Sequence, residues 1–173
     1  MKLEWMGQHR DLIEKIIKYG NAYSNTYKLQ RDYGTGVLLS ASQIQTLEYI
    51  LEAEDKDEKM SEMALRLGVS RSTFSKNVKS LTEKGLLEKF RLTGNRKDIY
   101  VKPSAKGYEV YQQYTAFIQK ECFDDIFQFA DELSDDSKES IKKLLDRFAE
   151  ALLWYGDKEQ EPQKLVRIEE ADY

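Results

Sequence analysis

The segment Met63–Phe90, "MALRLGVSRSTFSKNVKSLTEKGLLEKF", contains two short helical patterns that meet at a glycine. The first pattern ends at Gly68, a residue suited to the left-handed conformation that closes many helices. The second begins at Ser70, whose side chain makes it a good N-cap. The apolar positions of the second pattern recur at helical spacing and predict one buried face: Phe74, Val78 and Leu81. The opposite face is therefore expected to be open to solvent.

That open face is rich in hydroxyl and cationic side chains close to the start of the helix. Its residues are Ser72, Thr73, Ser75, Lys76 and Lys79. A helix N-terminus with such side chains is of a size and chemistry that suit the major groove of DNA. Similar helical pairs also occur in purely structural helical hairpins, so this pattern alone leaves both interpretations open.

After Gly85 the pattern changes from a helical period to an alternation of apolar and basic residues. Residues 89–92 alternate on one predicted strand, residues 93–98 supply Gly and Asn for a turn, and residues 99–101 alternate on the return. This pattern predicts a β-hairpin with a basic tip. A helix, a glycine turn, a second helix and a basic hairpin follow one another in the order of a winged helix-turn-helix.

Amphipathic helices are predicted on both sides of this segment. Residues 8–31 form the first helix, with Leu12 and Ile16 on its apolar face. Four serines are predicted to cap later helices: Ser40, with Gln43 in a capping box, Ser61, Ser104 and Ser134. Ser104 is expected to open one long helix that continues past Phe127, and Ser134 a final helix. The predicted fold class is therefore mainly α, a winged helix-turn-helix with a small β-hairpin wing and long N- and C-terminal helices.

The charge of the chain is divided unevenly along the sequence. Between Met60 and Lys106 there are 11 Lys and Arg residues against 4 Asp and Glu, a balance of +7, whereas the whole chain of 173 residues carries −4. A basic segment attracts polyanions such as DNA, and the acidic remainder restricts which face can dock. A solvated charged face is the other interpretation of the same run.

Composition excludes several other classes of protein. The mean hydropathy is −0.68 and 34% of the residues are charged, which does not fit a membrane protein. No apolar secretion signal follows Met1, so a cytoplasmic location is expected. One cysteine and one histidine make a zinc site unexpected, and neither a metal nor another cofactor is predicted. No catalytic motif is recognisable, so an enzyme is the weak hypothesis.

The sequence resembles the MarR family of bacterial transcriptional regulators over roughly residues 8–155. The resemblance is carried by "LSASQIQTLEYI" (39–50), "MSEMALRLGVSRSTFSKNVKSLTEKGLLEK" (60–89) and "NRKDIYVKPSAKG" (95–107). In the last string Asn95 stands where the family usually has Asp, and Lys97 where it usually has Arg, with Arg96 between them. This departure changes the two residues expected to form an internal salt bridge of the wing, but the wing keeps its positive charge.

The resemblance implies an obligate homodimer that binds a palindromic operator in double-stranded DNA. It implies dimerisation helices in residues 1–35 and 104–173 and a DNA-binding domain in residues 36–103. It also implies repression, often relieved by a small effector. An excess of apolar residues in the outer helices independently favours the dimer. The expected DNA-binding residues are Ser70, Arg71, Ser72, Thr73, Ser75, Lys76, Lys79, Arg91, Asn95, Arg96 and Lys97.

Further hypotheses concern the effector, the cysteine and the C-terminal tail. A small apolar or aromatic effector is a candidate ligand of Tyr19, Tyr23, Tyr27 and Tyr49, although tyrosines at helical spacing more often belong to a core or an interface. Cys122 is expected to be a buried, inert thiol, with oxidation sensing as the alternative. Apolar residues of the tail are expected to dock on the body or on a partner subunit: Leu165, Val166 and Ile168. A winged helix that binds protein instead of DNA is the alternative function.

Overall fold

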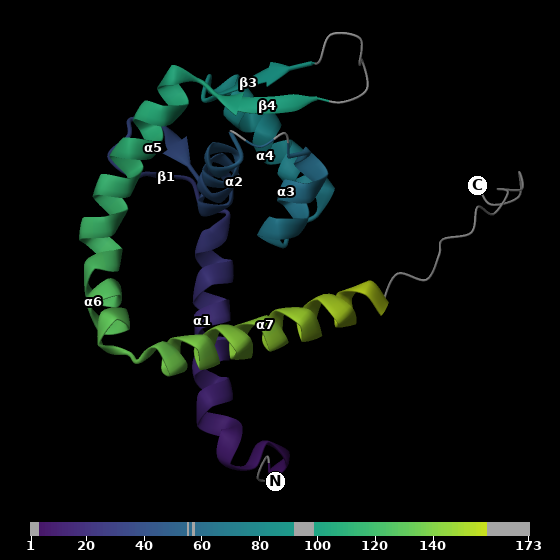
Figure 1. Ribbon diagram of the computed structural model, residues 1–173, viewed down its shortest axis with the longest axis vertical. Coiled ribbons are helices and arrows are strands. Elements are labelled where there is room, and N and C mark those ends of the chain that lie inside the picture. Colours follow the sequence, from purple (N-terminus) through teal and green to yellow (C-terminus); the bar gives the residue numbers. More distant parts are fainter. Residues whose placement is uncertain (1–3, 55, 57, 92–98, 159–173) are drawn as a thin grey trace, which may run out of the picture. The chain divides into compact units, whose positions relative to one another are not determined.

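The computed structural model describes residues 4–54, 56, 58–91 and 99–158, and the chain divides into two compact units, Met1–Glu121 and Cys122–Tyr173. The elements of the first unit are η1 (Glu4–His9), α1 (Arg10–Tyr27), β1 (Arg31–Asp32), β2 (Leu38–Leu39), α2 (Ala41–Glu52), α3 (Met60–Leu67), α4 (Arg71–Glu83), β3 (Leu87–Phe90), β4 (Tyr100–Pro103) and α5 (Ala105–Ile118). A π-helical turn, η2 (Gln119–Phe123), leads into α6 (Asp124–Glu132) and α7 (Asp135–Lys158). These elements are labelled in Figure 1 where there is room.

The first predicted helix, residues 8–31, is shorter than expected at its C-terminus. α1 ends at Tyr27, because the chain turns there to form a small antiparallel ladder in which β1 pairs with β2. The Asp32 carboxylate stabilises the turn between these strands by accepting a hydrogen bond from the Thr35 backbone at 2.9 Å. Two short strands, β1 and β2, therefore lie between α1 and α2. The helical pattern of the sequence did not predict that they pair.

α2 begins as the sequence predicts. The Ser40 hydroxyl accepts a hydrogen bond from the Gln43 backbone at 3.3 Å, and the Gln43 side chain accepts one from the Ser40 backbone at 3.1 Å. This is the predicted capping box. Ile44, Leu47 and Ile50 are buried on one face of α2, which makes this helix the centre of the core.

The prediction that Ser61 caps the third helix is wrong. α3 starts at Met60, and its N-cap is Lys59, whose backbone N–H donates to the Glu62 carboxylate at 2.9 Å. Glu62 therefore satisfies one free backbone donor without any help from a serine hydroxyl. Ser61 instead lies in the first turn of α3, half-buried.

The core of the first unit forms where α2, α3, α4, α5 and the β3–β4 hairpin meet (Figure 1). Its fully buried large side chains include Phe74 and Leu81 from α4 and Leu86 just before β3. The hairpin is antiparallel, with Leu87 opposite Pro103 and Phe90 opposite Tyr100. The strands thus have the predicted pairing, although Phe90 is 43% exposed and does not join the core.

One continuous long helix was predicted after Ser104, and the structure divides it. Ser104 does cap α5, since its hydroxyl accepts a hydrogen bond from the Gly107 backbone at 3.0 Å. The π-helical turn η2 then separates α5 from α6, and such turns shift the register of the helix faces on either side. Cys122 lies in η2 and is exposed, so the expectation of a buried thiol is wrong.

In the second unit, α7 begins after Ser134, whose hydroxyl accepts from the Ser137 backbone at 3.2 Å, as predicted. Many large apolar side chains of α6 and α7 are exposed in this single chain, including Ile126, Phe127 and Phe129. Leu165, Val166 and Ile168, which were expected to dock, lie outside the described residues. Within the described part of the chain, no helix has the length and apolar character needed to cross a membrane.

Candidate nucleic-acid interface

The turn between α3 and α4 sets the angle at which α4 leaves the core. Gly68 has a φ of 72°, a left-handed conformation that glycine adopts without a steric penalty, and it ends α3 as predicted. The Val69 backbone then donates to the Ala64 carbonyl at 3.0 Å. Ala64 is fully buried where the helices approach each other, so its small side chain keeps the turn tight.

The first turn of α4 is fixed by Ser70. Its hydroxyl accepts a hydrogen bond from the Thr73 backbone at 3.1 Å and lies 2.9 Å from the Thr73 hydroxyl. The predicted N-cap is therefore confirmed, and the Thr73 side chain is half-buried and held by this contact. Free backbone N–H groups and the partial positive charge of a helix N-terminus favour an anion here.

The rotation of α4 about its own axis is fixed by apolar and polar contacts on its inner face. Phe74, Val78 and Leu81 are buried, as the spacing predicts. Between them, the Asn77 amide donates to the Ser42 carbonyl at 3.1 Å, the Ser42 hydroxyl at 2.8 Å and the Thr46 hydroxyl at 3.0 Å. These three bonds to α2 resist rotation of α4, because any rotation would leave half-buried polar groups unpaired.

A second polar group joins the C-terminal end of α4 to the segment after α1. The Lys84 ammonium donates to the Gln43 side chain at 3.3 Å, to the Gln30 side chain at 3.2 Å and to the Leu38 carbonyl. Gln43 in turn donates to the Ser80 hydroxyl at 2.9 Å. Burial lowers the pKa of Lys84 below its ordinary value of 10.5. The middle of α4, through Asn77, and its C-terminal end, through Lys84, are therefore hydrogen-bonded to the elements behind it.

The outer face of α4 carries the side chains that the sequence assigned to DNA. Five of them are exposed: Arg71, Ser72, Ser75, Lys76 and Lys79. Lys79 lies 3.9 Å from the Glu83 carboxylate one helical turn later, in an exposed ion pair of small energetic weight. The structure thus brings these predicted residues together on one helix face.

The hairpin places further basic side chains beside α4. Lys89, Arg91 and Lys102 are all exposed on or next to β3 and β4. Asn95, Arg96 and Lys97, predicted at the wing tip, lie outside the described residues. The described part of the hairpin therefore adds positive charge next to α4, in agreement with the charge pattern of the sequence.

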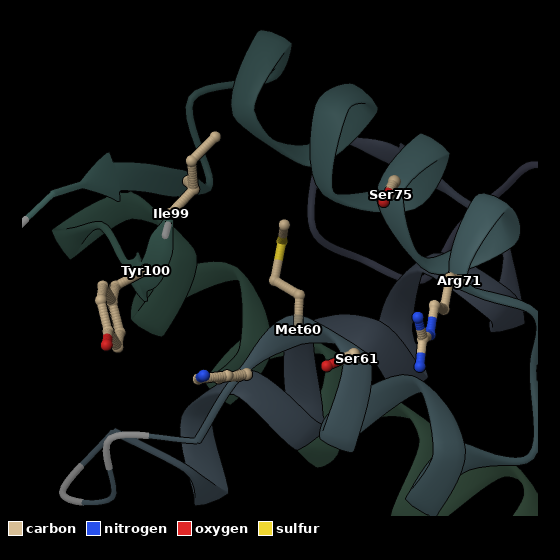
Figure 2. A pocket seen from close by; sticks show the side chains of 7 residues that line it. Met60, Ser61, Arg71, Ser75, Ile99 and Tyr100 are labelled. Carbon is tan, nitrogen blue, oxygen red and sulfur yellow. The ribbon is translucent and has the colours of Figure 1, made fainter. Parts of the chain in front are cut away.

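A cleft of about 270 Å³ lies between the N-terminus of α3, the start of α4 and the hairpin. In Figure 2 the Met60 side chain lies between a hairpin wall, with Ile99 and Tyr100, and an α4 wall, with Arg71 and Ser75. Its remaining lining residues are Lys59 and Ser61. The sequence did not indicate that Lys59, Ser61 and Tyr100 belong to this surface. The one sequence signal for this surface was Lys59, a basic residue immediately before the start of α3.

None of the tyrosines proposed as a ligand pocket lines this cleft. Tyr19, Tyr23 and Tyr27 form a ladder along α1, with ring centroids 6.1 Å and 5.1 Å apart. Gln45 donates to the Tyr23 hydroxyl at 2.6 Å, and burial is the main cause that raises the pKa of Tyr23. The Tyr49 ring lies under the Arg66 guanidinium at 4.5 Å. The tyrosine pocket stays a prediction, and among the described residues no group of His, Cys, Asp and Glu is arranged to hold a metal ion.

Comparisons with known proteins agree with this geometry. The Lactococcus lactis ZitR structure in complex with DNA is 17% identical, with a TM-score of 0.59 over 85% of this chain and 99% of that one. The S. aureus MepR–DNA complex is 19% identical, with a TM-score of 0.53 over 66% and 78% of the two chains. PcaV from Streptomyces coelicolor, in complex with its natural ligand, is 17% identical, with a TM-score of 0.56 over 85% and 96%. At these identities the likeness establishes the fold.

The comparison with curated proteins found no match. The model of the MarR family, however, matches residues 39–97, the segment from β2 through α2, α3, α4 and the hairpin. The structural neighbours align over most of their own length, 99% for ZitR and 96% for PcaV. Residues 39–97 are thus similar to the MarR family of transcriptional regulators, and the chain shares the fold of these neighbours.

Proposed function

We propose that the chain is a MarR-type transcriptional regulator that binds a palindromic operator as a homodimer, with one α4 in each major groove, and represses nearby genes. Regulators of the family are DNA-binding proteins without enzymatic activity. The outer face of α4 carries the proposal: it is exposed and basic, and the cap at Ser70 and the Asn77 hydrogen bonds hold it in a fixed orientation. A preorganised helix face lowers the entropic cost of binding.

The side chains of α4 divide into two roles by their position. Thr73 and Lys76 lie in the first two turns and are proposed to contact base edges, where sequence is recognised. Arg71, Ser72, Ser75 and Lys79 surround them and are proposed to contact phosphates. Lys59 and Ser61, which line the cleft beside Arg71, join this second group. Arg91 of the hairpin is proposed to contact the same DNA backbone. Asn95 is also proposed to contact DNA, and Arg96 and Lys97 to contact the adjacent minor groove.

Two structural neighbours, ZitR and MepR, were crystallised with DNA, and a third, PcaV, with a natural ligand. These complexes support DNA binding and a small effector for a chain of the same fold. We propose an apolar or aromatic effector that acts by changing the separation of the two recognition helices. Two such helices read two half-sites about 34 Å apart, so a modest change in spacing releases the operator.

Selection of DNA from a random-sequence pool by the purified full-length protein tests this function. We expect an enriched inverted repeat whose half-sites are separated by one helical turn or a multiple of it. Affinity for that repeat is expected to fall steeply as salt rises, because phosphate contacts release counterions. A pool that yields no inverted repeat, or an affinity that does not depend on salt, would favour the alternative of a protein-binding winged helix.

A further inference from the structure

A seam of polar residues runs along α4 to its C-cap, beside the buried apolar face. Asn77, Ser80 and Lys84 follow one another at three- and four-residue steps, so they lie on one side of the helix. Each is hydrogen-bonded to the N-terminal half of α2. Ser80 accepts from Gln43 at 2.9 Å, and Lys84 donates to Gln43 at 3.3 Å. Because hydrogen bonds are directional and apolar contacts are not, this seam fixes where α4 lies on α2.

The Lys84 ammonium lies among three neutral acceptors from three segments of the chain. They are the Gln30 side chain after α1, at 3.2 Å, the Gln43 side chain in α2, and the Leu38 carbonyl in β2. An ammonium carries three N–H donors on one nitrogen, so this set of acceptors uses all of them. Within the described part of the chain, Lys84 forms no ion pair with a carboxylate. These contacts, the Lys84 anchor, tie the C-terminal end of α4 to residues 30–43.

The start of α5 holds the backbone at the same end of α4. The Lys84 carbonyl accepts a hydrogen bond from the Lys106 ammonium at 3.2 Å. The next two carbonyls, of Gly85 and Leu86, accept from the Ser104 hydroxyl at 2.6 Å and the Ser104 backbone at 3.0 Å. The C-terminal end of α4 is thus held by its side chain through one set of segments and by its backbone through another.

The stability of the fold does not by itself account for a cation at this position. Partial burial disfavours the charged form of Lys84 and lowers its pKa. An apolar side chain of similar length would occupy the same space without the cost of desolvating a charge. The main side-chain acceptor also has other donors, since Gln43 accepts from the Gln30 side chain and from the Ser40 backbone, both at 3.1 Å. A role of Lys84 in the placement of α4 is therefore the better explanation.

A second anchor at Lys84 fixes the direction of α4 as well as its position. Asn77 fixes one point of the helix, and Lys84 lies about 10 Å further along the axis, at about 1.5 Å per residue. Thr73, which is proposed to contact a base edge, lies about 6 Å from Asn77 in the other direction. With Asn77 in place, a shift of about 1 Å at Lys84 thus moves Thr73 by roughly 0.6 Å. Recognition groups need to be placed within about 0.5 Å, so such a shift is enough to disturb base contacts.

We propose that Lys84 is a positioning residue for DNA recognition, which holds the C-terminal end of α4 so that Thr73 and Lys76 enter the major groove at the angle the operator requires. Lys84 acts through α4 and makes no contact with DNA. This role rests on the proposed function, since it needs α4 to be the recognition helix. Unrelated DNA is bound through phosphates, which tolerate a change of angle better than base edges do. Loss of the anchor therefore reduces discrimination between operator and unrelated DNA.

Side-chain NMR of the lysine ammonium groups in the full-length protein tests the anchor without DNA. The ammonium protons of Lys84 are expected to exchange slowly with water, because three acceptors hold them. Those of Lys79 and Lys142, whose side chains are 75% and 72% exposed, are expected to exchange too fast to be observed under the same conditions. Gln30→Leu removes one acceptor and is expected to speed the exchange at Lys84 several-fold. Exchange at Lys84 as fast as at the exposed lysines would overturn the proposal.

Binding isotherms on the selected operator and on unrelated DNA across a salt series test the positioning role. Lys84→Met keeps the length of the side chain and removes its donors. It is expected to lower the ratio of the two affinities at least about tenfold, as for a lost base contact, with an unchanged salt slope. Its melting temperature is expected to stay within about 3 °C of the wild type. Gln30→Leu is expected to lower the ratio several-fold, and the double variant no further than Lys84→Met alone, because both remove one anchor.

Three further lysine variants separate positioning from charge. Lys79→Met is expected to weaken both DNAs by similar factors and to reduce the salt slope by about one, because it loses a phosphate contact. Lys142→Met in α7 is expected to change neither quantity. Lys84→Arg keeps the charge but spreads its donors over a planar fork, so it is expected to keep the wild-type salt slope and to lose part of the discrimination.

The outcomes that overturn the proposal differ from those that overturn the proposed function. A salt slope reduced by about one in Lys84→Met and restored in Lys84→Arg would show a phosphate contact and exclude a positioning role. A lowered melting temperature with unchanged discrimination would show a purely structural role and exclude it as well. Both results leave the proposed function intact. A wild-type protein that selects no operator contradicts the proposed function, and the positioning role with it.

Discussion

Lys76 and Asn77 are neighbours in the sequence, yet they serve opposite sides of α4. The Asn77 amide is half-buried and bonded to α2, whereas the Lys76 side chain is exposed on the outer face. The hydrogen bonds from Asn77 to α2 therefore fix the direction in which the Lys76 side chain points. Because hydrogen bonds of this kind fix the helix rotation, single substitutions at these two positions should separate stability from DNA binding.

The first prediction assigns sequence recognition to Lys76. Lys76→Ala is expected to cost on the order of 1–3 kcal/mol of binding free energy, mainly on the operator, because a base contact is lost. Arg96→Ala is expected to weaken operator and unrelated DNA by similar factors and to reduce the salt slope by about one, because a phosphate or minor-groove contact is lost. Binding isotherms of both variants on both duplexes across a salt series decide this, with Lys142→Ala in α7 as the control.

If Arg96→Ala abolished discrimination between the duplexes and Lys76→Ala did not, the assignment of α4 as the recognition helix would be reversed. If neither variant changed DNA binding, the proposed function would be contradicted.

The second prediction concerns the inner face of the same helix. Asn77→Ala is expected to lower the free energy of unfolding by about 1–3 kcal/mol, because the buried Ser42 hydroxyl loses its amide donor. Ser72→Ala, an exposed position of the same helix, is expected to leave stability unchanged. Urea unfolding followed by circular dichroism measures both, and equal stability of the two variants would contradict the role of Asn77.

The third prediction is a pH dependence that originates at Tyr111. Its hydroxyl donates to the Glu48 carboxylate at 2.6 Å, and burial followed by this bond raises its pKa well above the ordinary 10.0. A raised pKa in the folded state contributes stability that is complete below pH 10.0 and is lost as the pH rises through the folded-state pKa. The free energy of unfolding should thus fall above pH 10.0, and less so in Tyr111→Phe than in the exposed control Tyr19→Phe. Urea unfolding at neutral pH and above pH 10.0 tests this difference.

At the scale of elements, the start of α5 is packed directly onto the turn that leads from α4 into the hairpin. Ser104 donates through its backbone to the Leu86 carbonyl at 3.0 Å and through its hydroxyl to the Gly85 carbonyl at 2.6 Å. A Cβ at Gly107 would lie 2.2 Å from the Leu86 oxygen. The absence of a side chain at Gly107 therefore allows α5 to approach the base of the wing.

The fourth prediction follows from this close approach. Gly107→Ala is expected to lower the free energy of unfolding by about 1–3 kcal/mol or more, because the backbone around Leu86 must move. Gly20→Ala is the matched control, since Gly20 lies within α1 with no atom within 4 Å of its added Cβ. That substitution should stabilise the protein by about 0.5–1 kcal/mol through helix propensity. Thermal unfolding of both variants gives the sign of each effect, and a neutral Gly107→Ala would contradict the packing argument.

At the scale of the whole molecule, the single chain exposes more large apolar side chains than an isolated protein of this size is expected to leave in water. In α1 these include Leu12, Ile17 and Tyr19. In α7 they include Ile141, Leu145 and Leu152, the last of which is 72% exposed. Patches of this kind indicate an interface, and association of two identical chains is the commonest way to cover them.

The fifth prediction is that the protein is a homodimer at micromolar concentration. Leu145→Glu and Leu152→Glu together are expected to shift it to a monomer, because a carboxylate in an apolar interface is costly to desolvate. Lys142→Glu, which changes the charge of the same helix at an already polar position, should leave the dimer intact. Analytical ultracentrifugation distinguishes the two masses, and a wild-type monomer would contradict the prediction.

The sequence by itself determined the order of the elements from α2 to the β3–β4 hairpin and the character of the two faces of α4. The caps at Ser40, Ser70 and Ser104 were predictable, because each is a hydrogen bond between groups three residues apart. The helical spacing of the apolar residues predicted the buried face of α4. The basic residues between them were therefore predicted to lie on the opposite, exposed face. Local geometry also explains why the predicted N-cap at Ser61 was wrong. The Glu62 carboxylate accepts the hydrogen bond of the Lys59 backbone N–H, so that Lys59 is the N-cap.

Only the tertiary structure decided which distant residues share a surface. The early end of α1 depends on the pairing of β1 with β2, and the division of the long helix depends on a π-helical turn, for which no sequence pattern was available. The cleft joins Lys59, Arg71 and Tyr100 from three separate segments. Their proximity depends on how α3, α4 and the hairpin pack around one core, and packing of that kind leaves no period or spacing in the sequence.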